Sequence, residues 1–416
     1  MKRISILLCL ILAISCTSKE EKHVQEQIST LTTEIGDDLL NNLLPFWMKY
    51  TPDERGGFYG EVNYDGTPVP EADKAGILNA RILWSFSSAY RIFGKDEYKV
   101  LADRAADYYI NHFIDKEYGG VFYQVTCDGE PSNTQKHTYC CAFGIYALSE
   151  HYRATGSEAS LEAAKDLFKT FEEHIYDNEK GGYLEIFTRD WQAPQPRPGR
   201  PQLTKTMNTH IHVMEGLTNL YRVWPDEVLR TRLLGLLDIL STHLYNSETK
   251  HLILYCDSDW NSFNNGDSYG HDIETSWLLY ETAEVLGDEA WIEKIRKQSI
   301  DMCSTALEEG LREDNAMMYE KRGDHYQDFS AWWCQNETVV GCVNAWQLTG
   351  DVKYLDQAVA TWNFANTYHV DKINGGWFCN LNRDNSPKYD EKKASTWNCP
   401  YHNSRMAYEV LTRLGK

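Results

Sequence analysis

The chain has 416 residues, of which 42% are hydrophobic and 25% are charged, so it can bury a large core and is neither disordered nor collagen-like. Its 41 Lys and Arg residues against 61 Asp and Glu residues leave a formal net charge of −20. A surface this acidic repels phosphate backbones, and we therefore expect no nucleic-acid partner.

The first fifteen residues are predicted to be an export signal. Lys2 and Arg3 precede an almost wholly apolar run at residues 4–14, which is shorter than the roughly 20 residues of a membrane-spanning helix. Small residues lead into Cys16, as in the lipobox of bacterial lipoproteins; a plain cleaved signal peptide is the alternative. We interpret residues 1–15 as a lipoprotein signal peptide, Cys16 as the lipidation site and residues 16–22 as a tether. We expect an exported bacterial lipoprotein, on the periplasmic side of a membrane or at the cell surface, that touches the membrane only through this lipid anchor.

A repeat organises the remaining chain. Four Gly-Gly pairs, each followed by aromatic residues, begin at Gly56, Gly119, Gly181 and Gly375. The first three starts are 63 and 62 residues apart, and the last gap of 194 residues accommodates three steps of about 65. The spacing therefore implies six units.

Each unit is predicted to hold two amphipathic helices joined by a turn. The turns carry Gly94, Gly156, Pro225, Gly287, Gly350 and Gly415, and glycine is the usual left-handed cap after a helix. The sixth unit lacks its second helix because the chain ends, whereas residues 23–50 carry a spare apolar helical stripe. Six closed helix pairs predict one all-α domain over residues 23–416, an (α/α)6 barrel with the first helices inside and short β-hairpins at its mouth. An open solenoid would instead need polar caps at both ends.

The repeat also predicts which residues share a place in the barrel. Counting back 13 residues from each turn marker gives Arg81, Phe143, His212, Glu274, Glu337 and His402. Five of these six are ionisable, which indicates a polar central cavity. One helical turn earlier lie Ile77, Tyr139, Asn208, Gly270, Trp333 and Asn398, and such aromatic rings and amides are typical of sugar sites. His271 adjoins this layer, three residues before Glu274.

Histidine and cysteine spacing does not favour a metal site. His210 and His212 diverge by about 200° on a helix, so we expect only His212 to face inward and His210 to pack between helices. A helical metal pair needs histidines four residues apart, and the sequence has no Cys-x-x-Cys pair. We therefore expect no bound metal.

The segments that carry this register resemble the N-acylglucosamine 2-epimerase superfamily, and its cellobiose 2-epimerase (mannobiose 2-epimerase) branch in particular. The matching runs are NARILW at 79–84, KHTY at 136–139, KTMNTHIH at 205–212, YGHDIETSW at 269–277, WWCQNE at 332–337 and CPYHNSR at 399–405. The resemblance covers nearly all of the chain after the signal, and the fold it implies is again the (α/α)6 barrel.

The resemblance implies an isomerase of the EC 5.1.3 class that epimerises C2 of the reducing-end sugar in β-1,4-linked disaccharides such as cellobiose and mannobiose. No cofactor is expected, because a proton moves and no hydride does. Such chemistry needs bases with a pKa near neutrality, which histidine supplies. His271 and His402 match the family's acid/base pair for C2, and which of them serves which face stays open.

Further roles are expected for the other ionisable residues. His212 would assist ring opening or hold O1, and Arg81 would stabilise the enediolate oxyanion. Glu274 and Glu337 would set histidine tautomers, balance Arg81 and bind hydroxyls. Substrate contacts are expected from Tyr139, Asn208, Trp277, Trp333, Trp397 and Arg405, with Trp333 and Trp397 stacking on the sugar rings. We expect the protein to be a monomer.

Three other functions compete with this interpretation. An aldose-ketose isomerase of the same superfamily would share the enediolate, although the motifs around Tyr139 and Trp397 disfavour it. A glycoside hydrolase would use Glu274 and Glu337 as its two carboxylates, which leaves three histidines and an arginine without a role. A lipid-anchored sugar-binding protein would need no proton-transfer groups.

Overall fold

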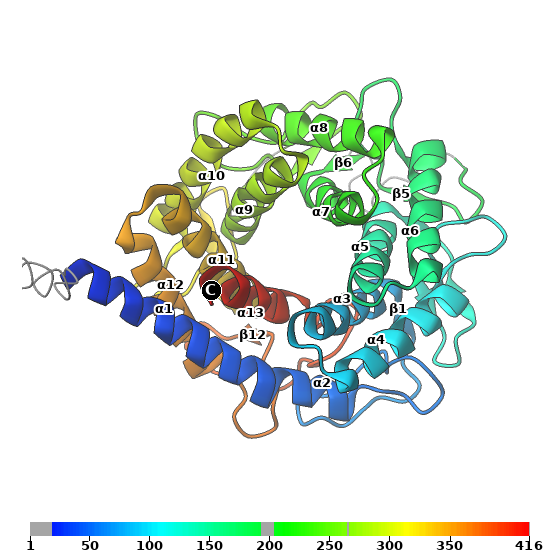
Figure 1. Ribbon diagram of the computed structural model, residues 1–416, viewed down its shortest axis with the longest axis horizontal. Coiled ribbons are helices and arrows are strands. Elements are labelled where there is room, and N and C mark those ends of the chain that lie inside the picture. Colours follow the sequence, from blue (N-terminus) through cyan, green and yellow to red (C-terminus); the bar gives the residue numbers. More distant parts are fainter. Residues whose placement is uncertain (1–18, 193–203, 264–265, 416) are drawn as a thin grey trace, which may run out of the picture.

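The computed structural model describes residues 19–192, 204–263 and 266–415, which form a closed ring of helices (Figure 1). Cys16 and the predicted signal peptide lie outside the described residues. Residues 19–22, the last residues of the expected tether, form the exposed first turn of α1. Over the described ranges, no helix is both long and apolar enough to cross a membrane.

Inner and outer helices alternate along the chain (Figure 1). The inner helices are α3 (Gly76–Phe93), α5 (Thr138–Thr155), α7 (Met207–Val223), α9 (Tyr269–Leu286), α11 (Trp332–Thr349) and α13 (Tyr401–Leu414). The outer ones are α1 (Lys19–Asp38) with α2 (Leu44–Tyr50), α4 (Asp96–Tyr108), α6 (Glu158–Thr170), α8 (Glu227–Thr242), α10 (Glu289–Gly310) and α12 (Val352–Tyr368). Single π-helical turns, η1 (Leu39–Leu43), η2 (Tyr109–Phe113) and η3 (Phe171–Ile175), follow α1, α4 and α6. Each inner helix packs on the next and α13 packs on α3, so the predicted (α/α)6 barrel is confirmed.

The sixth helix pair is built from both ends of the chain. α1 lies against α12 and α13. The indole Nε1 of Trp362 donates to Glu34 at 2.8 Å, and that of Trp377 donates to Asp38 at 2.9 Å. The N-terminal helix therefore closes the ring, as the spare apolar stripe predicts.

Short antiparallel strand pairs lie at the N-terminal ends of the inner helices, where hairpins were predicted. Each pair joins the segment that enters a helix pair to the segment that leaves it. The pairs are β1 (Lys74–Ala75) with β2 (Gln124–Val125), β4 (Lys136–His137) with β5 (Ile186–Phe187), β6 (Lys205–Thr206) with β7 (Tyr255–Cys256), β8 (Gly266–Asp267) with β9 (Glu320–Arg322), and β11 (Ser330–Ala331) with β12 (Asn380–Leu381). Two further strands, β3 (Pro131–Asn133) and β10 (His325–Gln327), extend the first and fourth pairs. A bridge between Val62 and Ala394 takes the same place in the sixth repeat.

The glycine pairs mark a turn that recurs in all six repeats. In Gly120 and Gly182 the backbone φ is 71° and 80°, and a Cβ atom at either position would lie 2.6 Å from a tryptophan ring of the following segment. Two repeats lack the glycines, and there Lys250 and Asn315 adopt the left-handed φ values of 65° and 68°. These two turns account for the long gap between Gly181 and Gly375.

A buried lysine precedes four of the inner helices and pairs with an aspartate of the neighbouring turn. The Nζ–Oδ2 distances are 2.9, 2.9, 2.8 and 2.6 Å for Lys74–Asp53, Lys136–Asp115, Lys205–Asp177 and Lys393–Asp371. Each pairing offsets the cost of removing the two charges from water, and losing one partner would leave the other charge buried alone. The pairs thus tie the turns to the helix ends that form the mouth of the barrel.

Candidate active site

A cavity of about 280 Å³ opens among the N-terminal turns of the inner helices. Nine of the predicted site residues line it, namely Arg81, Tyr139, Asn208, His212, His271, Glu274, Trp333, Trp397 and His402. They come from α3, α5, α7, α9, α11, α13 and the segment before α13. Counting from the turn markers therefore predicted correctly that residues more than 300 positions apart in the sequence, such as Arg81 and His402, line one cavity.

Three predicted site residues lie beneath the cavity instead of lining it. Trp277 and Arg405 are each only 1% exposed. The indole Nε1 of Trp277 donates to Glu337 Oε2 at 3.1 Å, and Glu337 is equally buried. Neither Trp277 nor Arg405 lines the cavity, so the expected contact of these two side chains with substrate has no support from the cavity lining.

Arg405 connects three carboxylates under this floor. Its Nη2 donates to Glu337 Oε1 at 2.6 Å and also to Glu274, and its Nη1 donates to Glu215 and to the hydroxyl of Tyr401. The glutamates thus balance the positive charge of Arg405. The sequence had led us to expect that they would balance the charge of Arg81. Although burial opposes ionisation of Glu215, the charge of Arg405 leads the interactions that lower its pKa to about 2.

Each of the three cavity histidines has its Nδ1 atom engaged. His212 Nδ1 lies 2.9 Å from Glu215, His402 Nδ1 lies 2.7 Å from Glu337, and His271 Nδ1 lies 2.6 Å from the Ser268 hydroxyl. Within the described part of the chain, no hydrogen bond is formed by the Nε2 atom of any of these rings. Nε2 is therefore the nitrogen that each ring offers to a ligand in the cavity.

Burial keeps two of these histidines neutral near pH 7. Desolvation lowers the pKa of His271 to about 4, although the charge of Glu274 partly opposes it. Desolvation also holds the pKa of His402 well below its usual range. A neutral imidazole with a free Nε2 can accept a proton, so both rings can act as bases, His271 from α9 and His402 from α13, the two inner helices that flank α11.

Arg81 brings an unpaired positive charge to the cavity. Its Nη2 donates to the Tyr139 hydroxyl at 2.6 Å and its Nη1 to Cys399 Sγ at 3.6 Å. Across the described ranges, Arg81 forms no ion pair and its Nε has no hydrogen-bond partner. Its guanidinium is therefore free to stabilise a negative charge on a ligand.

Aromatic rings form two walls of the cavity. Trp397 is 48% exposed and its ring centroid lies 5.7 Å from that of Tyr139. On the other side, Trp333 lies 4.6 Å from His271, and the stacked rings of Tyr319 and Phe329 lie 4.9 Å apart. An exposed tryptophan beside half-buried aromatic rings suits stacking on the apolar faces of pyranose rings.

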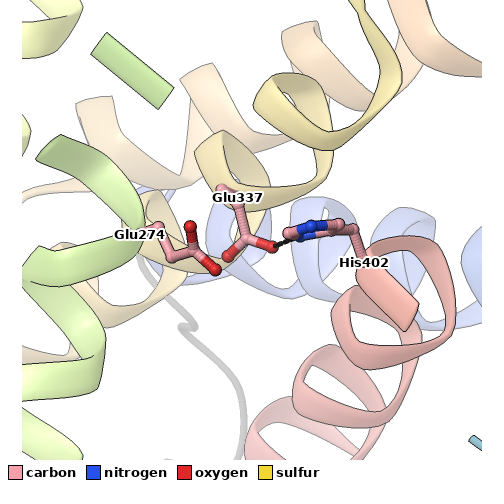
Figure 2. Close-up of side chains that lie close together, drawn as sticks. All are labelled: Glu274, Glu337 and His402. Carbon is pink, nitrogen blue, oxygen red and sulfur yellow. Dashed lines mark hydrogen bonds and ion pairs between the residues drawn. The ribbon is translucent and has the colours of Figure 1, made fainter. Parts of the chain in front are cut away.

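Glu274, Glu337 and His402 meet at the floor, where their ligand atoms all lie within 4.8 Å of one another (Figure 2). Carboxylates and an imidazole at such distances are a donor set that metals use. Here, however, the Arg405 guanidinium already donates to both carboxylates, and His402 uses its Nδ1 for Glu337. A protein cation thus already occupies both carboxylates, which fits a metal poorly.

Comparison with known proteins agrees with this geometry. A family model described as N-acylglucosamine 2-epimerase (GlcNAc 2-epimerase) matches residues 57–404. The chain belongs to the N-acylglucosamine 2-epimerase family. It is 43% identical to the cellobiose 2-epimerase of Bacteroides fragilis over 92% of this chain and 98% of that protein, and 37% identical to the cellobiose 2-epimerase of Ruminococcus albus over 92% and 99%. The solved structure of cellobiose 2-epimerase from Bacillus thermoamylovorans matches with a TM-score of 0.89 at 36% identity, covering 92% of this chain and all of that one.

Several residues of this family member's site were not predicted from the sequence. Glu215 and Ser268 hold two of the histidines, and each lies three residues from its partner along the chain, a spacing that helix geometry makes detectable. Tyr319, Phe329, Trp332 and Asn380 also line the cavity. Tyr319 and Phe329 flank the β9–β10 hairpin outside the helical register, so counting along the helices could not find them.

Proposed function

We propose that this member of the N-acylglucosamine 2-epimerase family interconverts glucose and mannose at the reducing end of β-1,4-linked disaccharides such as cellobiose and mannobiose. The names of its relatives support this substrate class. The observation that carries the proposal is the presence of two neutral histidines, His271 and His402, with free Nε2 atoms in the same cavity as the unpaired cation of Arg81.

The reaction begins with opening of the hemiacetal, which exposes an aldehyde next to C2. One of the two histidines then removes the weakly acidic C2 proton, and the negative charge that develops on the enediolate is stabilised by Arg81. The other histidine, once it has taken a proton from solvent, gives that proton to C2 from the opposite face, which inverts C2. The first histidine releases the proton that it removed to solvent, so both rings return to their starting state. His212 assists ring opening at O1, and Glu215 stabilises the imidazolium that forms when His212 takes a proton. Proton transfer needs no cofactor.

Recognition of the disaccharide uses the aromatic walls. Trp333, which packs against His271, stacks on the reacting ring, and the exposed Trp397 stacks on the second ring. Tyr139 on α5 and Asn208 on α7 form hydrogen bonds with hydroxyl groups of the reacting ring.

A glycoside hydrolase fits this site less well. Its two carboxyl groups must flank the scissile bond, about 5–10 Å apart, with one of them available as an acid. Glu337 is 1% exposed and shares the Nη2 atom of Arg405 with Glu274, so it cannot reach a glycosidic oxygen. A ketose-forming isomerase would use the same enediolate, and the destination of the returned proton distinguishes it from an epimerase.

One experiment separates these functions. The chain without its signal peptide is incubated with cellobiose in D2O and the sugars are followed by NMR. We expect a 2-epimer that carries deuterium at C2. A ketose would indicate the isomerase, monosaccharides would indicate a hydrolase, and unchanged, undeuterated sugar would indicate a binding protein; each of these results contradicts the proposal.

We further propose that the protein is an exported lipoprotein, acts as a monomer and meets its sugars outside the cytoplasm. The apolar run at residues 4–14 and Cys16 after it support export and lipidation. Expression in a bacterium fed with labelled palmitate should label the wild-type protein and leave Cys16→Ser unlabelled. Equal labelling of both proteins, or of neither, would contradict a lipid on Cys16. Light scattering of the soluble chain should give the mass of one chain.

A further inference from the structure

The inner helix α9 is anchored with the opposite polarity from the four inner helices that carry a lysine–aspartate pair. In front of α3, α5 and α7, a lysine stands 20 residues before the helix-ending Gly94, Gly156 or Pro225 and pairs with an aspartate of a turn. In front of α9 the same position holds Asp267. Here the turn supplies the cation, His251, and the helix supplies the carboxylate, Asp272.

His251 and Asp272 form a closely bonded buried pair. His251 is 3% exposed, and its Nδ1 lies 2.7 Å from Asp272 Oδ2. The backbone N–H of Leu252 donates to the other oxygen of Asp272 at 2.8 Å. The second ring nitrogen of His251, Nε2, lies 3.3 Å from Glu309 on α10. Both oxygens of Asp272 thus bind the turn, and the histidine joins the turn to α9 and α10.

The pair lies directly beside a residue of the proposed acid/base pair. Asp272 follows His271 in the first turn of α9. His212 and His402 are held by carboxylates that Arg405 anchors, whereas His271 is held through Nδ1 by the hydroxyl of Ser268, the residue that precedes the helix. The placement of His271 therefore depends on how firmly the first turn of α9 is fixed.

We propose that His251 is a positioning residue for the epimerisation, and that its protonated ring holds Asp272 and the first turn of α9 so that His271 Nε2 is aimed at C2 of the sugar. The loss of this proton at alkaline pH then limits turnover from outside the cavity. The inference rests on the proposed function, and it adds a residue that touches neither the substrate nor the cavity.

The surroundings of His251 favour its charged form. Asp272 and Glu309 contact it, Asp267 lies close enough to add its charge, the Tyr269 ring lies 5.9 Å away, and Lys250 is its neighbour in the turn. Burial by itself would lower the pKa of His251, but the hydrogen bond and charge of Asp272 raise the pKa to about 9. Because the folded-state pKa is raised, the stabilisation is complete below the unfolded value of about 6.5 and is lost as pH rises through about 9.

The test compares kcat for C2 epimerisation of cellobiose between pH 6 and 11 in the wild type, His251→Gln and His251→Lys, after subtraction of the sugar-only reaction. We expect wild-type kcat to fall through about pH 9. His251→Lys restores the cation that the other repeats use and should move this fall upward by about one pH unit. His251→Gln should lower kcat about tenfold below about pH 9, with KM little changed, and should lose the alkaline fall near pH 9, so that it approaches the wild type above that pH.

Lys136→Met is the matched control, because it removes the equivalent cation in front of α5, which carries none of the three cavity histidines. It should lower thermal stability and keep the wild-type pH at which kcat falls. A wild-type alkaline fall in both His251 variants would overturn the inference, as would unchanged kcat in His251→Gln.

NMR of labelled histidine gives a readout that does not depend on activity: the His271 ring signals should shift in the transition near pH 9 in the wild type and not in His251→Lys. An inactive wild type would refute the proposed function, and His271 signals that ignore the His251 transition would refute this inference alone.

Discussion

Replacing Arg405 with methionine is expected to destabilise the fold by about 3–5 kcal/mol and to abolish epimerisation. The guanidinium is fully enclosed and is the shared partner of Glu215, Glu274 and Glu337. Its loss leaves three buried carboxylates close together without a cation, and they must either repel one another or take up protons. Urea unfolding followed by circular dichroism measures the loss of stability, and deuterium exchange at C2 measures the loss of activity.

Arg413→Met is the matched control, because it removes an arginine near the other end of the same helix, α13, where Glu409 is its partner at 2.7 Å. We expect it to be less damaging to stability and to leave C2 exchange intact. Arg405→Lys keeps the positive charge but cannot bond several partners through a planar fork, so it should fold and still lose most of kcat. Wild-type kcat in Arg405→Lys would contradict the role given to this network.

Changing His402 to alanine is expected to stop deuterium incorporation at C2, with a loss of about 100-fold to 10,000-fold in kcat. The ring lines the cavity with a free Nε2, and Glu337 orients it through Nδ1 at 2.7 Å, so alanine removes the oriented base. His271→Ala should have an effect of the same size, because inversion needs a proton-transfer group on each face of C2. The rate of exchange by NMR measures both variants.

His174→Ala serves as the control for these two variants. His174 lies in the π-helical turn after α6 and stacks on Trp191 with a centroid separation of 4.8 Å, away from the cavity residues. It should keep wild-type exchange. Full exchange together with full epimerisation in either His402→Ala or His271→Ala would refute the assignment of that histidine to C2. Loss of epimerisation with retained exchange would indicate that the histidine only returns the proton.

The repeat made the architecture and much of the cavity predictable. The glycines that end α3, α5, α9 and α11 all adopt left-handed φ values, so the residue type that the sequence displays is the one that the backbone needs at that point. A fixed distance from such a cap is a fixed place on the helix. For this reason counting from the caps predicted that Arg81, His212 and His402 line one cavity.

The same counting could not find what lies beneath or beside the cavity. Arg405 belongs to a matching motif, and its residue type suggested a contact with substrate, yet it faces inward between helices and binds Glu215 from the opposite side of the ring. Nor does any local pattern indicate that Tyr319 and Phe329 reach over the cavity from the β9–β10 hairpin.

The sequence by itself thus determined the number of repeats, the closed ring and the inward-facing polar register, because these follow from periodic signals along a single chain. Only the tertiary structure decided which charge is paired with which. Arg405 binds the buried glutamates, whereas Arg81 has no carboxylate partner. His251 pairs with Asp272 in the repeat where the turn supplies the cation and the helix supplies the carboxylate. Ion pairing depends on burial and on distances of a few ångströms between side chains from different helices, and sequence spacing specifies neither.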